Sequence, residues 1–188
     1  MRARSLPIAA ALLVALVVSA APAAAAPLKG VFHIGTGSYI RLRQPNNGPF
    51  FSNPYSADAD KTYTLLVPGT AGGLRTGAVQ GAPTPAFDAK GNSLAGSIIK
   101  PTNFAGVLFG LATTSAPSIS LSGSTLSGQV NGLVAQWNNQ TFNQGGKVTG
   151  TYNAKKRTYV LTWTSLVSGG PFNGFTGYWR LQGRFTTG

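Results

Sequence analysis

Hydrophobic and polar residues alternate along the C-terminal part of this chain. Thr158–Thr164 carries threonines and one valine on one side and large apolar side chains on the other. Tyr178–Phe185 repeats the pattern, with Arg180 and Arg184 among its polar positions. A period of two places successive side chains on opposite faces of a β-strand. The pattern therefore predicts antiparallel strands with one face in a core and the other in solvent.

Shorter segments of similar composition lie along the rest of the chain. Asn153–Arg157 separates two predicted strands and is expected to form a hairpin connection. Asp88–Asn92 is expected to form a turn in which Gly91 adopts positive φ. The other expected strands are Val31–Ile34, Tyr39–Arg43, Tyr63–Val67, Phe104–Ala112, Ser118–Leu121, Gly128–Trp137 and Val148–Tyr152.

Glycine and proline are frequent throughout the chain after residue 25, and no window there shows a helical stripe. Both residues destabilise helix interiors and are favoured in turns. Residues 44–58 and 68–86 have weak periodicity and are expected to be long loops or irregular edge segments. We therefore expect residues 26–188 to form one all-β domain, either a single antiparallel β-sandwich or a partly closed β-barrel.

The N-terminus has the order of a secretory signal peptide. Two arginines precede an apolar stretch, Leu6–Val18, and an alanine-rich tract follows it, with cleavage expected after Ala25. The apolar stretch is shorter than the roughly 20 residues of a bilayer span. We therefore predict removal of residues 1–25, a mature chain without a transmembrane segment, and a secreted or periplasmic location.

The chain is strongly basic, with fifteen Lys and Arg residues, three acidic residues and a net charge of +12. Positive charge keeps an exported protein soluble, and it also attracts acidic polysaccharide, lipid headgroups or nucleic acid. The basic residues are dispersed, apart from the cluster Lys155–Arg157. No pattern of a known nucleic-acid-binding module is present, so we expect no specific nucleic-acid partner.

Side chains that transfer protons or bind metals are scarce. Asp58, Asp60 and Asp88 are the only acids, His33 is the only histidine, and cysteine is absent. A hydrolase would need His33 beside a carboxylate and a nucleophile, and no local motif indicates this. Asp58 and Asp60, at alternate positions, are a weak candidate for Ca²⁺, which prefers oxygen ligands. We therefore predict no catalytic residue and no cofactor.

The candidate ligand-binding residues are basic or aromatic. If the basic groups meet in the fold, they form the best candidate for an anionic surface site. Aromatic rings near Asn- and Gly-rich turns, Trp137 among them, either fill the core or offer ring faces to sugars. The full candidate set is Arg41, Arg43, Trp137, Lys155, Lys156, Arg157, Arg180 and Arg184.

The C-terminal third, which includes Trp137–Gly146, Val148–Asn153 and Gly169–Gly183, resembles a group of uncharacterised exported bacterial proteins. The resemblance covers residues 129–185 best. Many of these proteins carry a PEP-CTERM sorting tail, which is associated with bacteria that produce exopolysaccharide and form biofilms. The tail itself is missing from the printed sequence, so we expect release or periplasmic residence. The resemblance implies a bacterial source and an envelope or matrix setting, and it implies no catalytic residues.

These observations together predict a noncatalytic, exported bacterial protein of the envelope or extracellular matrix. It would bind or assemble with acidic or neutral polysaccharide. One alternative is a carrier of a small ligand or lipid, with a cavity inside a β-barrel. A hydrolase that uses His33 is the third hypothesis. The sequence does not decide between a monomer and an oligomer.

Overall fold

The computed structural model describes residues 25–188, which fold almost entirely into β-strands. The predicted signal peptide, apart from Ala25, lies outside the described residues. Within residues 25–188 we find no helix of the length and apolar character needed to cross a membrane. The elements are β1 (Ala26–Pro27), β2 (Gly30–His33), β3 (Tyr39–Arg43), β4 (Thr64–Leu65), β5 (Gly73–Thr76), β6 (Thr102–Phe104), β7 (Val107–Thr113), β8 (Ser118–Ser122), β9 (Thr125–Gln129), β10 (Leu133–Trp137), β11 (Gln140–Asn143), β12 (Lys147–Asn153), β13 (Thr158–Leu166), β14 (Thr176–Thr187) and one short 3₁₀ helix, η1 (Gly170–Phe172).

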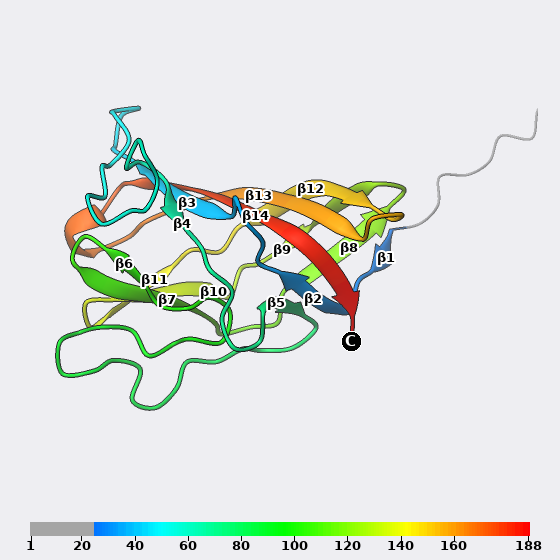
Figure 1. Ribbon diagram of the computed structural model, residues 1–188, viewed down its shortest axis with the longest axis horizontal. Helices are drawn as coiled ribbons and strands as arrows, with labels where there is room; N and C mark the ends of the chain where they lie inside the picture. The colour runs from blue at the N-terminus through cyan, green and yellow to red at the C-terminus, as the bar shows by residue number, and fades with distance from the viewer. Residues whose placement is uncertain (1–24) are drawn as a thin grey trace, which may run out of the picture.

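The larger of two sheets is antiparallel and follows the order β1-β8-β9-β12-β13-β14-β2-β5. Strand β14 is its centre. One edge of β14 pairs with β13 over nine residues, while the other edge pairs first with β3 and then with β2. Strand β4 extends the sheet beyond β3. Strands β2 and β3 from the N-terminal part of the chain and β13 from the C-terminal part therefore pair with the two edges of one long strand, β14 (Figure 1).

Gly183 lies where β14 changes its partner from β3 to β2. Its φ is 155°, a value that side-chain-bearing residues rarely adopt. A Cβ atom at this position would lie 2.1 Å from the carbonyl oxygen of His33. Glycine therefore permits the close approach of β14 to the β2–β3 connection.

The smaller sheet has the order β11-β10-β7-β6 and lies beneath one half of the large sheet (Figure 1). The inward residues of the long strands alternate with exposed ones, as the period of two predicts. Large side chains from both sheets fill the space between them. This core includes Phe32, Ile40, Leu42, Phe104, Phe109, Leu111, Trp137, Phe142, Leu161, Trp163, Trp179 and Leu181.

The predicted all-β class is confirmed, and several predicted strands have nearly the expected bounds. The segment Tyr39–Arg43 is β3 as predicted, and Asn153–Arg157 joins β12 to β13. The predicted strand Phe104–Ala112 is β7 from Val107 onward, but it begins later than predicted, because Ala105 and Gly106 both adopt positive φ and turn the chain from β6 into β7. The predicted strand Gly128–Trp137 is also interrupted, since its two halves belong to different sheets.

Strand β5 was not predicted, because it lies within 68–86, a region of weak periodicity. Its outer edge is closed by a single side chain, that of Gln80. The amide of Gln80 accepts a hydrogen bond from the backbone of Arg75 and donates one to the carbonyl of Gly73, at 2.7 and 2.9 Å. The backbone of Gln80 meanwhile pairs with Thr113 at the end of β7. This buried residue therefore occupies a sheet edge and connects the two sheets.

Candidate functional site

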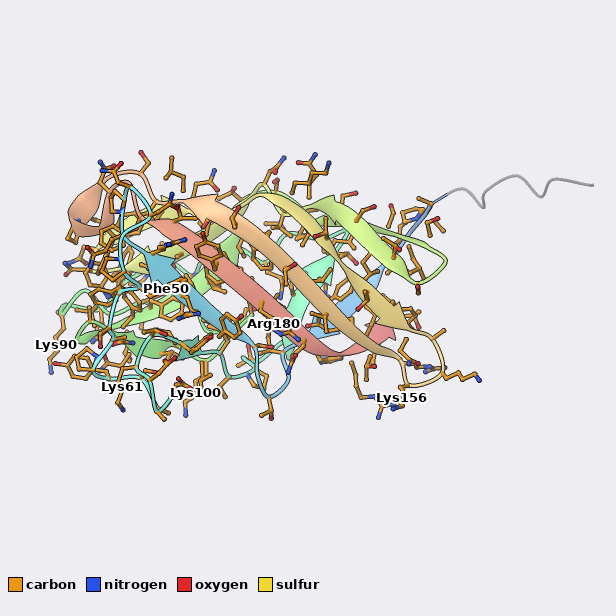
Figure 2. The ribbon with its side chains drawn as sticks, turned by 90° about the horizontal axis from the view of Figure 1, so that it is seen from above. Phe50, Lys61, Lys90, Lys100, Lys156 and Arg180 are labelled. Atoms are coloured by element: carbon orange, nitrogen blue, oxygen red, sulfur yellow. The ribbon has the colours of Figure 1, made fainter. Side chains whose placement is uncertain are left out.

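The outward side chains of β14 form a polar row along the large sheet. Tyr178, Arg180, Gln182 and Arg184 alternate with buried Trp179 and Leu181. Arg180 lies near the middle of the molecule in the view of Figure 2, and Lys156 lies at one end. The row leads past two surface hollows, which together make up the candidate site.

The first hollow, which we call the hairpin groove, has a volume of about 600 Å³. This volume falls in the range of about 300–1,000 Å³ that is usual for small-molecule sites. The end of the β12–β13 hairpin next to its tip forms one wall, and the β2–β3 connection forms another. The lining residues are Gly35, Thr36, Thr151, Tyr152, Asn153, Thr158, Tyr159, Val160, Gln182, Gly183 and Arg184.

The hairpin groove presents hydroxyl and amide groups with one cation. Arg184 is the only charged residue in its lining. The Arg184 side chain is exposed and makes no hydrogen bond or ion pair within residues 25–188. Tyr152 is half-buried and packs edge-on against Phe185, with ring centroids 6.2 Å apart. The groove can therefore hold a hydroxyl-bearing ligand and neutralise one negative charge on it.

The basic cluster Lys155–Arg157 lies at the tip of the hairpin, beside this groove. The tip is tight because the backbone N–H of Lys156 donates to Asn153 Oδ1 at 3.0 Å and Arg157 adopts positive φ. All three basic side chains are exposed. Arg184 pairs across the strands with Thr158, directly after the tip. The backbone at Arg184 therefore lies beside the strand end that follows the hairpin cluster.

A second hollow, which we call the tyrosine hollow, lies further along β14 and has a volume of about 360 Å³. Gln182 stands between the two hollows. Its amide donates to the carbonyl of Thr36 and accepts from Arg180 Nε at 3.0 Å. The lining residues of the tyrosine hollow are Gly37, Tyr39, Asp58, Tyr63, Leu65 and Arg180.

The guanidinium of Arg41 is engaged in contacts within the protein. Its guanidinium lies 3.6 Å from the centre of the Phe50 ring and 4.0 Å from that of Tyr63. It also donates to the Tyr63 hydroxyl and to Thr62 Oγ1, each at 2.9 Å. These contacts fasten the loop between β3 and β4 to the sheet.

Arg43 also stabilises the loop between β3 and β4, because it donates to the carbonyls of Gly48 and Asn47 at 3.1 and 3.0 Å. The basic residues of the candidate set therefore do not meet in one patch. Arg184 lies beside the strand end that follows the hairpin cluster, Arg180 stands apart in the tyrosine hollow, and Arg41 and Arg43 hold a loop.

The prediction that Trp137 offers its ring to a surface ligand is wrong. Its side chain is 8% exposed, and its indole N–H donates to the carbonyl of Phe104 at 2.7 Å. Phe104 and Phe172 pack edge-on against the indole. The ring belongs to the core because inward-facing positions of β10 meet the large sheet.

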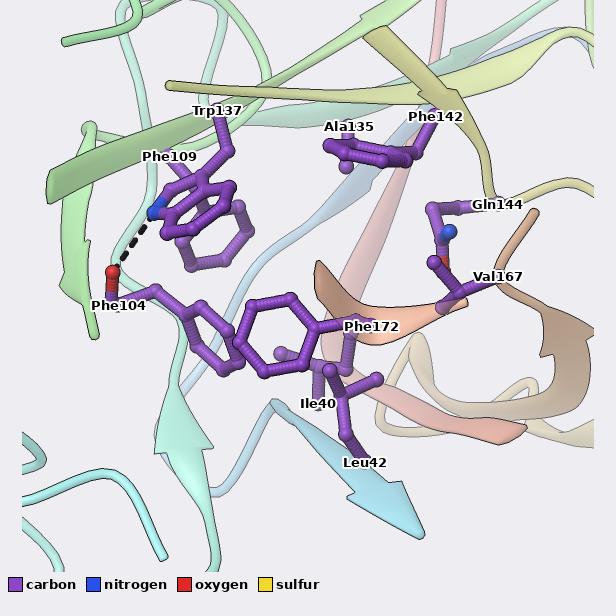
Figure 3. Close-up of a pocket in the computed structure, with 10 residues that line it drawn as sticks. All are labelled: Ile40, Leu42, Phe104, Phe109, Ala135, Trp137, Phe142, Gln144, Val167 and Phe172. Carbon is purple, nitrogen blue, oxygen red and sulfur yellow. Dashed lines mark hydrogen bonds between the residues drawn. The ribbon is translucent and has the colours of Figure 1, made fainter. Parts of the chain in front are cut away.

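Trp137 lines an apolar cavity of about 50 Å³ between the two sheets (Figure 3). This volume is far below the range of about 300–1,000 Å³ found for small-molecule sites. The cavity in this form has no room for a lipid chain. Its lining residues are Ile40, Leu42, Phe104, Phe109, Ala135, Trp137, Phe142, Gln144, Val167 and Phe172.

Asp58, Asp60 and His33 are each engaged in hydrogen bonds within the protein. Asp58 Oδ2 accepts from the backbone of Asp60, and Asp60 Oδ1 accepts from the backbone and hydroxyl of Thr62. His33 Nε2 lies 2.9 Å from Thr186 Oγ1. Within residues 25–188 no three His, Cys, Asp or Glu side chains gather as metal ligands would. The carboxylates of Asp58 and Asp60 therefore accept hydrogen bonds from residues of their own loop.

Sequence reasoning identified Arg180 and Arg184 as candidate binding residues. The alternation also places Gln182 between them on the same polar face, but Gln182 was not among the candidates. Thr36 and Asp58 enter the site through loops that carry no such signal. Comparison with known protein families, characterised proteins and solved structures gives no significant match to this chain.

Proposed function

We propose that this protein is an exported, noncatalytic bacterial protein of the envelope or extracellular matrix that binds acidic polysaccharide in the hairpin groove. The observation that carries the proposal is the composition of the groove. Arg184 lies there among hydroxyl and amide groups, with the exposed cluster Lys155–Arg157 alongside. A sugar carboxylate matches the cation, and sugar hydroxyls match the neutral groups.

The scarcity of groups that transfer protons supports binding over catalysis. Among residues 25–188, no carboxylate and no histidine line the groove. General acid–base chemistry needs such groups within hydrogen-bonding reach of the substrate. The excess of Lys and Arg over acidic residues also favours acidic partners, because positive charge raises their concentration near the surface.

The test is binding of the purified protein to immobilised polygalacturonate at low and at high sodium chloride. Affinity should fall as salt rises, because salt screens exposed charges. Replacing Lys155, Lys156 and Arg157 together by Gln should lower the affinity by at least about threefold, given typical energies of exposed charge pairs. Arg184→Gln should lower it as well.

A matched control removes the same number of charges elsewhere. Arg75, Lys90 and Lys100 are exposed and lie outside both hollows. Their joint replacement by Gln changes the net charge equally and should leave most of the affinity intact. Equal losses in the two triple variants would show nonspecific attraction and would reject the groove as the site.

A further inference from the structure

The tyrosine hollow differs chemically from the hairpin groove, although both lie along β14. Its lining contains a carboxylate, Asp58, as well as a cation, Arg180. The Nε of Arg180 is engaged with Gln182, and the terminal nitrogens of Arg180 make no hydrogen bond within residues 25–188. Asp58 and Arg180 therefore face the same hollow without pairing to each other.

Asp58 Oδ2 accepts from the backbone N–H of Asp60, which leaves other lone pairs of this carboxylate available. A carboxylate and a guanidinium that do not pair with each other suit a neutral, hydroxyl-bearing group. A sugar hydroxyl can donate to the carboxylate and accept from the guanidinium at the same time. A second carboxylate would be repelled by Asp58. Tyr39 and Tyr63 add aromatic surface to the hollow, with their rings edge-on and 4.7 Å apart.

The two hollows lie close enough for one linear chain to occupy both. Arg184 and Arg180 are four residues apart on the same face of β14, which corresponds to about 14 Å of extended strand. The boundary between the hollows is the Gln182 side chain, which is held by Thr36 and Arg180. Gln182 is itself neutral and lines the groove.

We infer that the protein selects a linear heteropolysaccharide, with an acidic sugar in the hairpin groove and a neutral sugar in the tyrosine hollow. This inference rests on the proposed function, and it specifies the class of polysaccharide. A chain whose every sugar is acidic places a carboxylate against Asp58. A wholly neutral chain leaves Arg184 without a partner.

The experiment compares three oligosaccharides of equal length by calorimetry. Oligogalacturonate carries a carboxylate on every sugar, a hyaluronan oligosaccharide alternates acidic and neutral sugars, and a chito-oligosaccharide is neutral. The protein should bind the hyaluronan oligosaccharide most tightly, although that probe has half the charge of oligogalacturonate.

Two variants test whether Asp58 causes the preference for the hyaluronan oligosaccharide over oligogalacturonate. Asp58→Asn should tighten binding of oligogalacturonate by about two- to fivefold, the range expected for one exposed charge–charge interaction, and should not tighten binding of the hyaluronan oligosaccharide. Asp88→Asn is the matched control, because Asp88 lies outside both hollows, and it should leave the ratio of the two affinities unchanged.

The outcomes separate the two proposals. If oligogalacturonate binds most tightly and Arg184→Gln weakens this binding, the hairpin groove is supported as the acidic site. The neutral subsite in the tyrosine hollow is then rejected. The neutral subsite is also rejected if Asp58→Asn leaves the selectivity unchanged. If no oligosaccharide binds, the proposed function and the further inference both fall.

Discussion

The indole rings of Trp163 and Trp179 lie face to face across β13 and β14, with centroids 5.4 Å apart and an interplanar angle of 1°. Both indole N–H groups are satisfied although the rings are buried. Trp163 donates to the carbonyl of Gln144 at 2.9 Å, and Trp179 donates to Ser165 Oγ at 3.0 Å. Ser165 in turn donates to Gln144 Oε1 at 2.7 Å. One polar chain therefore joins the two tryptophans beneath the large sheet.

Ser165→Ala should destabilise the fold by about 1–3 kcal/mol. The change leaves the Trp179 N–H and Gln144 Oε1 buried without a partner, and each then keeps its desolvation cost. Urea unfolding followed by tryptophan fluorescence measures the free energy of unfolding. Thr164→Ala is the control, because Thr164 is the exposed neighbour on the same strand and should change stability by no more than about 0.5 kcal/mol. Equal effects of the two changes would contradict the role given to Ser165.

Gln80→Leu should destabilise the protein by about 1–3 kcal/mol and promote association. Leucine has a similar size, but it leaves the Arg75 N–H and the Gly73 carbonyl without their amide partner. The uncovered edge of β5 then resembles an open strand edge, which can pair with another chain. Urea unfolding and light scattering at several protein concentrations test both effects. Val79→Ala changes an exposed neighbour and should show neither of them.

Ala135→Val should stabilise the protein by about 0.5–2 kcal/mol, because its added methyl groups fill part of the cavity beside Trp137. Ala112→Val is the matched control. Ala112 is 1% exposed and does not line the cavity, so valine there overpacks the core and should cost about 1–3 kcal/mol. Thermal unfolding of the two variants should therefore move in opposite directions. Destabilisation by both changes would show that the cavity walls cannot accept the extra volume.

The turn at Asp88 should loosen in acid. Hydrogen bonds from the side chain and backbone of Asn92, together with the backbone N–H and charge of Lys90, hold the pKa of Asp88 below its ordinary value of 3.8. A lowered pKa means that the folded state prefers the carboxylate. Its contribution is therefore complete above pH 3.8 and is lost as the pH falls through the lower folded-state pKa.

Carboxyl NMR titration should give a midpoint for Asp88 below 3.8, and the amides of residues 90 and 92 should exchange faster once it protonates. Asp88→Asn removes the titration while keeping one acceptor oxygen. In that variant the protection of these amides, taken relative to their intrinsic exchange rates at each pH, should no longer change across this pH range. A midpoint at or above the ordinary value would contradict the assignment of these hydrogen bonds.

Much of the sheet could be predicted because alternation is a local property. Thr158–Thr164 and Tyr178–Phe185 were placed in strands with the correct faces, and Arg180 and Arg184 point outward as expected. The predictions were poorer where a turn lies inside an apolar run. Ala105 carries no turn signature, yet with Gly106 it reverses the chain between β6 and β7.

The candidate site was predicted only in part, because its residues come from separate segments. Arg41 has the same outward position on its strand as Arg180 has on β14. Its different role comes from Phe50 and Tyr63, which enclose its guanidinium from a loop whose path the sequence does not indicate. Trp137 is likewise a core residue because the small sheet packs against the large one.

By itself, the sequence determined the all-β class, the inward and outward faces of the long strands, the hairpin tip and the shortage of proton-transferring groups. These follow from spacing and composition, which act between neighbours in the chain. The tertiary structure alone decided which cations remain free, where the two hollows lie, and how Gln80 closes a sheet edge. Such features depend on contacts between residues far apart in sequence, and local patterns carry no information about them.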